Sequence, residues 1–162
     1  MLRFVNYNIV FQEVPGEVTL AINLSNCPNR CTGCHSPYLQ ENTGLVLDNN
    51  ILNKLLEKYG NTITCVCFMG GDASPKKVEQ CSVFLRNQTN ERIKTAWYSG
   101  KNYFPKDCSL QNFDYIKLGA YIEQLGGLDS KTTNQRFYRI DNGKMINMTG
   151  MFLKKEMVEY LK

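Results

Sequence analysis

The chain of 162 residues carries 19 basic and 15 acidic side chains, for a formal net charge of +4, and its 43% apolar and 21% charged content is typical of a soluble globular protein of one domain, residues 1–162. The small charge and the lack of any run of five basic residues argue against a nucleic-acid partner. No apolar run reaches the roughly 18 residues that a membrane span requires, so no membrane partner is expected.

Two β-prone segments precede a cysteine-rich loop. Residues 3–12 are β-prone and partly alternating, and Pro15-Gly16 indicates a turn. Residues 18–24 are predicted to form a second strand, which ends at Ser25-Asn26. That strand leads into the segment Cys27-Pro-Asn-Arg-Cys31-Thr-Gly-Cys34-His-Ser-Pro37.

The cysteines of this segment have the spacing C-x3-C-x2-C. Three thiolates from one loop suit an iron–sulfur cluster or a zinc ion, because soft sulfur ligands select these metals. An ordinary cubane cluster takes four cysteines, so Cys27, Cys31 and Cys34 would leave one metal corner without a protein ligand. An open coordination position is typical of metal sites that carry out chemistry.

The cysteine count indicates a redox compartment. The chain holds seven cysteines, an odd number, and Met1-Leu-Arg-Phe leads into an alternating segment that does not resemble a signal peptide. We therefore expect a cytoplasmic protein with metal-bound or free thiols and no disulfide framework.

Strands and helices are predicted to alternate through the middle of the chain. A helix is expected from the capping residue Asp48 to about Tyr59. Residues 63–69 form a continuous apolar run, typical of a strand buried on both faces, and run directly into Gly70-Gly71-Asp72. A second helix is expected to begin at Ser74-Pro75.

The C-terminal half repeats this pattern more weakly. Further strands are expected at 92–98, ending at Ser99-Gly100, and at 113–118, ending at Gly119; a hairpin is expected at 136–148 around Asp141-Asn142-Gly143, and a short helix at about 153–161. Strands that alternate with helices imply a mostly parallel sheet, in which ligands bind at the carboxyl ends of the strands. The cysteine loop and the three glycine-containing strand ends all fall there.

The motifs resemble those of a known superfamily. The cysteine motif after one strand, with Gly70-Gly71-Asp72 after the next, resembles the radical S-adenosylmethionine superfamily. One of its branches, the anaerobic ribonucleoside-triphosphate reductase activating proteins, is similar in three further segments: Cys31-Thr-Gly-Cys34-His35-Ser-Pro37, Trp97-Tyr98-Ser99-Gly100 and Thr133-Asn134-Gln135-Arg136. The resemblance covers about residues 18–140.

This resemblance implies a fold and a reaction. The fold would be α/β, an incomplete (partial) β/α barrel with a mostly parallel sheet. Cys27, Cys31 and Cys34 would hold three irons of a [4Fe-4S] cluster, and S-adenosylmethionine would chelate the fourth. One electron, from a donor such as flavodoxin or ferredoxin, would cleave the sulfonium C–S bond, and the resulting 5′-deoxyadenosyl radical would abstract hydrogen from a glycine of the reductase.

The resemblance also implies cofactor-binding roles for individual residues. Gly70 and Gly71 would let the backbone approach S-adenosylmethionine closely, and Asp72 would face its ammonium group. In the family a proline commonly follows this motif directly. Here Ala73 and Ser74 come first, and the proline is Pro75. At the cysteine loop, Gly33 would stand beside Cys34 where many members have an aromatic residue, and His35 would supply the flat surface for the adenine. Ser99 and Lys117 would contact the carboxylate or the ribose.

Other readings stay open. The cysteines could hold a structural zinc ion in a non-catalytic binding module, although His35 directly follows Cys34 and would strain a shared tetrahedral site. Within the enzyme class, the chain could activate another glycyl-radical enzyme or act on a small molecule. Cys65 and Cys67 share one strand face and, like Cys81, are expected to be buried as small hydrophobic side chains.

Overall fold

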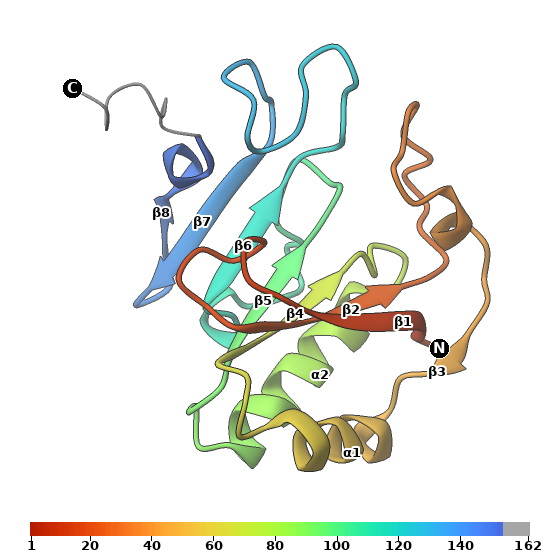
Figure 1. Ribbon diagram of the computed structural model, residues 1–162, viewed down its shortest axis with the longest axis vertical. Coiled ribbons are helices and arrows are strands. Elements are labelled where there is room, and N and C mark those ends of the chain that lie inside the picture. The colour runs from red at the N-terminus through yellow and green to blue at the C-terminus, as the bar shows by residue number, and fades with distance from the viewer. Residues whose placement is uncertain (154–162) are drawn as a thin grey trace, which may run out of the picture.

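The computed structural model describes residues 1–153, in which eight strands form one sheet (Figure 1). The strands are β1 (Arg3–Val10), β2 (Thr19–Leu24), β3 (Leu45–Val46), β4 (Cys65–Met69), β5 (Lys94–Tyr98), β6 (Tyr115–Leu118), β7 (Arg136–Asp141) and β8 (Lys144–Asn147), in the order β3-β1-β2-β4-β5-β6-β7-β8. The helices are α1 (Asn49–Tyr59) and α2 (Pro75–Gln88), with short 3-10 helices η1 (Pro37–Gln40), η2 (Leu110–Asn112) and η3 (Thr149–Phe152).

Parallel pairing is confined to the centre of the sheet. Strands β2, β4, β5 and β6 are parallel, whereas β3, β1 and β2 on one side and β6, β7 and β8 on the other pair antiparallel. The sheet is therefore mixed, whereas the sequence predicted a mostly parallel sheet. The difference arises because β1–β2 and β7–β8 are hairpins, which can only pair antiparallel, and only β4 and β5 are reached through a long helix.

Local sequence signals place most elements correctly. The Asp48 carboxylate accepts a hydrogen bond from the Ile51 amide at 2.9 Å, as expected of the residue that caps α1. Helix α2 begins at Pro75 as predicted, although the Ser74 side chain makes no capping bond. The hairpin around Asn142-Gly143 is confirmed. Of the helix predicted at 153–161, all but Leu153 lies outside the described residues.

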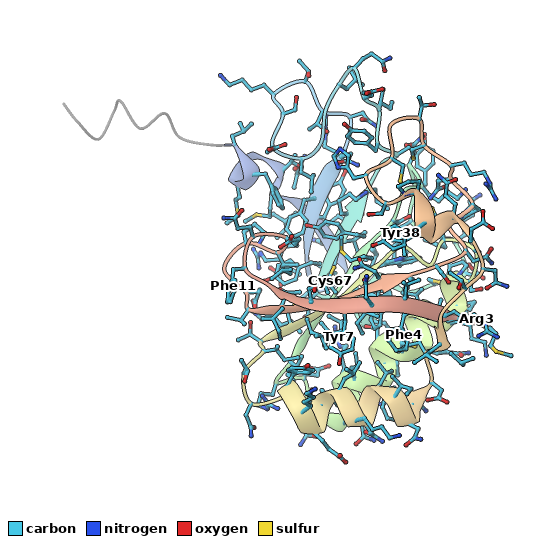
Figure 2. The ribbon with its side chains drawn as sticks, turned by 45° about the vertical axis from the view of Figure 1, so that its right-hand side comes forward. Arg3, Phe4, Tyr7, Phe11, Tyr38 and Cys67 are labelled. Atoms are coloured by element: carbon cyan, nitrogen blue, oxygen red, sulfur yellow. The ribbon has the colours of Figure 1, made fainter. Side chains whose placement is uncertain are left out.

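Helices α1 and α2 pack on one face of the sheet. Figure 2 shows Phe4 and Tyr7 of β1 directed toward α1, where the Tyr7 ring lies 5.7 Å from that of Tyr59. The core between the helices and this face includes Leu52 of α1 and Val78 of α2, which are almost fully buried. No helix within residues 1–153 is long and apolar enough to cross a membrane.

The opposite face of the sheet has a smaller core. It is covered by Val14, from the connection between β1 and β2, and by Phe152 of η3, whose ring lies 5.1 Å from Phe137. Cys65 and Cys67 lie on this face with no exposed surface, and burial raises the pKa of both thiols. The prediction that they are buried small side chains is confirmed.

Candidate metal and cofactor site

The carboxyl ends of the four parallel strands meet at one edge of the sheet. The pairing register aligns Asn23 with Met69, Met69 with Tyr98, and Tyr98 with Lys117. The loops that follow these residues therefore start side by side. This brings together the cysteine loop, the Gly70-Gly71-Asp72 turn, Ser99-Gly100 and the end of β6, as the sequence predicted.

The cysteine loop is held at its base by backbone bonds to the segment that follows it. The amides of Asn26 and Cys27 donate to the carbonyls of Glu41 and Leu39, both at 2.9 Å. Within the loop, Arg30 and Gly33 have positive φ angles of 46° and 74°, so the backbone turns sharply between the cysteines. All seven cysteines are free thiols, and the three of the loop are partly exposed.

The loop offers the right ligands without a preformed metal cage. Within residues 1–153, no group of three or more His, Cys, Asp or Glu side chains lies close enough to hold a metal ion. The donor set of three free thiols fits an iron–sulfur cluster chemically. Two of the sulfurs also accept hydrogen bonds: Cys27 from the Asn29 amide at 3.6 Å, and Cys34 from the Ser36 backbone at 3.4 Å. Such bonds stabilise negative charge on sulfur ligands.

Asp72 connects three of the converging loops. Its Oδ1 accepts a bond from the Ser99 hydroxyl at 2.6 Å, and its Oδ2 accepts from the Gly100 amide at 2.8 Å and the Asn29 side chain at 2.6 Å. The carboxylate is thus fixed in orientation beside the cysteine loop. Asp72 and Ser99 were predicted from the sequence to belong to this site. Asn29 was not, although its position between two cysteines was an available signal.

Of the two glycines before Asp72, Gly70 forms hydrogen bonds with β5 through its backbone and Gly71 packs closely against the core. Gly70 donates its amide to the Tyr98 carbonyl at 3.0 Å and accepts at 2.7 Å from the indole nitrogen of Trp97. A Cβ on Gly71 would lie 2.5 Å from Val78 and 2.8 Å from Leu24, both on the buried side. Core packing therefore accounts for the absence of a side chain at Gly71, and the ligand contact expected from the sequence stays a prediction.

Lys117 places a buried ammonium group at the end of β6. Its side chain donates to the Gly119 carbonyl at 3.1 Å, and Nζ lies 5.7 Å from the ring centroid of Tyr98. Burial lowers the pKa of Lys117 to about 8, although the nearby Asp72 and the thiols of the cysteine loop act in the opposite direction. Among the described residues, no carboxylate forms an ion pair with it. Lys117 is therefore suited to an anionic ligand.

The segment after β6 contacts the far end of the cysteine loop. The His35 ring lies 4.9 Å from that of Tyr121 at an interplanar angle of 51°, and a Cβ on Gly33 would lie 3.0 Å from the Glu123 carboxylate. His35 itself is exposed. Tyr121 and Glu123 were not identified from the sequence, because neither belongs to a motif with a recognisable spacing.

The segment Thr133-Asn134-Gln135-Arg136 forms hydrogen bonds with the residues that directly follow β6. The side-chain amides of Asn134 and Gln135 donate to the carbonyls of Ala120 and Gly119 at 3.0 and 3.3 Å. Gly119 is thus held from two sides, because its carbonyl also accepts from Lys117. These contacts position the Lys117 strand end.

Most of the chain matches a known protein family. A family model described as a 4Fe-4S single cluster domain matches residues 14–123. This stretch contains the three loop cysteines, Asn29, Asp72, Ser99 and Lys117. No curated protein and no solved structure matches the chain.

Proposed function

Because the chain belongs to the 4Fe-4S single cluster domain family, we propose that it is a radical S-adenosylmethionine enzyme that generates a glycyl radical on anaerobic ribonucleoside-triphosphate reductase. Family membership supports an iron–sulfur protein. The observation that carries the finer proposal is the position of Asp72 and Lys117 beside a loop of three cysteines. When bound, a [4Fe-4S] cluster supplies the single electron that reductive cleavage of S-adenosylmethionine requires.

Each residue of the site has a role in this proposal. Cys27, Cys31 and Cys34, which are free thiols, would hold three irons of the cluster and leave the fourth for S-adenosylmethionine. The amino-acid end of S-adenosylmethionine carries one ammonium and one carboxylate, and the site offers one fixed carboxylate at Asp72 and one buried ammonium at Lys117. The charges are complementary, and the burial of Lys117 strengthens its contact with the carboxylate.

We further propose that the parallel centre of the sheet forms an incomplete β/α barrel that admits a glycine-containing segment of the reductase. A hollow of about 700 Å³ on the face opposite the helices is lined by Tyr98, Leu128 and Phe152, among others. The ring of Tyr98 borders both this hollow and Lys117. A flexible glycine segment can enter such an open hollow where a folded segment cannot.

The proposal also includes a compartment and an electron donor. All seven cysteines are free thiols, which supports the reducing cytoplasm as the place of action. A one-electron protein donor, such as flavodoxin or ferredoxin, would reduce the cluster.

The test mixes the anaerobically reconstituted protein, reductant, S-adenosylmethionine and the reductase, and records an electron paramagnetic resonance spectrum. We expect a glycyl doublet that disappears when the reductase glycine is changed to Ala. A doublet on a different glycyl-radical enzyme, with none on this reductase, would overturn the choice of partner. A colourless protein that binds zinc and no iron would overturn the chemistry and favour a structural zinc module.

A further inference from the structure

Asn29 lies between the first two cysteines of the loop and contacts two groups of the site. Its Nδ2 donates to Asp72 Oδ2 at 2.6 Å and to Cys27 Sγ at 3.6 Å. A primary amide carries two N–H hydrogens, so both are used. A carboxylate and a thiolate can only accept, so the NH2 end of the amide must face them and the orientation of the side chain is determined chemically.

The lack of a side chain at Gly100 leaves room for the Asn29 side-chain amide. A Cβ on Gly100 would lie 2.5 Å from Asn29 Nδ2 and 3.5 Å from Asp72 Oδ2, so any larger residue would push the amide out of place. The Gly100 backbone amide donates to the same Asp72 oxygen at 2.8 Å. The end of β5 therefore both leaves room for Asn29 and fixes the carboxylate that Asn29 binds.

We infer that Asn29 is a positioning residue that fixes the Cys27 thiolate and the Asp72 carboxylate relative to each other, an inference that rests on the proposed function. Its effects divide between the two contacts. The N–H bond to Cys27 stabilises charge on a cluster ligand, which favours the reduced cluster and raises its midpoint potential. The bond to Asp72 holds the carboxylate in the orientation that receives the ammonium group of S-adenosylmethionine.

The experiment compares Asn29→Asp and Asn29→Ala with the wild-type protein, all reconstituted anaerobically. Asn29→Asp keeps nearly the same shape but removes both N–H donors, whereas Asn29→Ala removes the side chain without adding charge. Asn42→Ala is the control, because Asn42 is exposed just beyond the same loop. Circular dichroism and iron content establish folding and loading. Spectroelectrochemical titration gives the midpoint potential, and the spectrum of the reduced cluster is titrated with S-adenosylmethionine.

We expect both Asn29 variants to fold and take up iron, with a more negative midpoint potential than the wild type. Half-saturation by S-adenosylmethionine should require about tenfold more ligand, the effect of losing a charge-assisted hydrogen bond. Asn42→Ala should match the wild type in both measurements.

The possible failures are distinguishable. Wild-type potential and affinity in both Asn29 variants would overturn the role of Asn29 and leave the proposed function intact. Folded Asn29 variants that take up no iron would also overturn it, because Asn29 would then serve only to fold the loop. A wild-type protein that takes up no cluster would overturn the proposed function and this inference together.

Discussion

A Cβ atom on Gly71 would lie 2.5 Å from Cγ2 of Val78, and Gly71 has a φ angle of 91°. Both features oppose a side chain here, so Gly71→Ala should destabilise the metal-free protein by about 2–4 kcal/mol, from overpacking and backbone strain combined. Urea denaturation measures this loss. Gly16→Ala is a matched control, because Gly16 has a φ angle of 81° and no atom within 4 Å of the added Cβ. Equal losses in the two variants would rule out the packing contribution.

The three loop cysteines should each be required for cluster binding. Replacing any of Cys27, Cys31 or Cys34 by Ala removes one of three thiolates, so iron content and broad visible absorption after reconstitution should be lost. Cys65→Ala and Cys67→Ala should retain the iron and the absorption, because these two thiols are fully buried in the core on the face of the sheet opposite the helices. Iron that survives in Cys31→Ala but disappears in Cys65→Ala would show that the ligand assignment is wrong.

Cluster binding should protect the cysteine loop from trypsin. Arg30 is exposed between Cys27 and Cys31, and no metal cage is preformed around it in the described part of the chain. A cluster would fix the backbone on both sides of Arg30, so cleavage there should slow by about tenfold, equivalent to about 1.4 kcal/mol of local stabilisation. Mass spectrometry of the fragments measures this rate. Cleavage after Arg92, also exposed but at the other end of β5, should be unchanged.

The buried Lys117 should make the stability of the metal-free protein depend on pH. Its pKa falls from 10.5 to about 8 on folding, so between these values the unfolded chain binds more protons and stability rises with pH. At pH 7 the buried ammonium costs about 3 kcal/mol relative to a neutral side chain. Lys117→Met should therefore stabilise the protein at pH 7 by up to about 3 kcal/mol, with the gain vanishing near pH 10.5.

Denaturant titrations of the wild type and of Lys117→Met at pH 7, 9 and 10.5 test this prediction. Other groups that titrate in this range are present in both proteins, so their contributions largely cancel in the difference. The exposed Lys144 provides the control variant, Lys144→Met. A stability difference that stays constant over the three pH values would contradict the assignment of this pH dependence to Lys117.

The sequence predicted those features that depend on neighbouring residues. The Asp48 cap, the Asn142-Gly143 hairpin and the glycine-containing strand ends are local signals, and the structure has all of them. The predicted alternation of strands and helices also indicated that the cysteine loop and the loops after β4, β5 and β6 meet at one edge of the sheet.

The features that the sequence missed depend on residues far apart in the chain. Asn29 and Asp72 are 43 positions apart, and no spacing rule connects them. The requirement for Gly71 is set by Leu24 and Val78, which belong to two other elements. The antiparallel pairing of β6 with β7 follows a long connection whose direction no local signal determines.

The hydrogen bond from the Trp97 indole to the Gly70 carbonyl makes the intrinsic tryptophan fluorescence a reporter of the candidate site. Trp97 is the sole tryptophan of the chain, is fully buried, and donates to Gly70 at 2.7 Å. All tryptophan fluorescence therefore originates at one position, hydrogen-bonded to the turn that carries Asp72. A ligand that moves this turn alters the polarity at the indole nitrogen and shifts the emission, so occupancy of the site can be followed in the unlabelled protein.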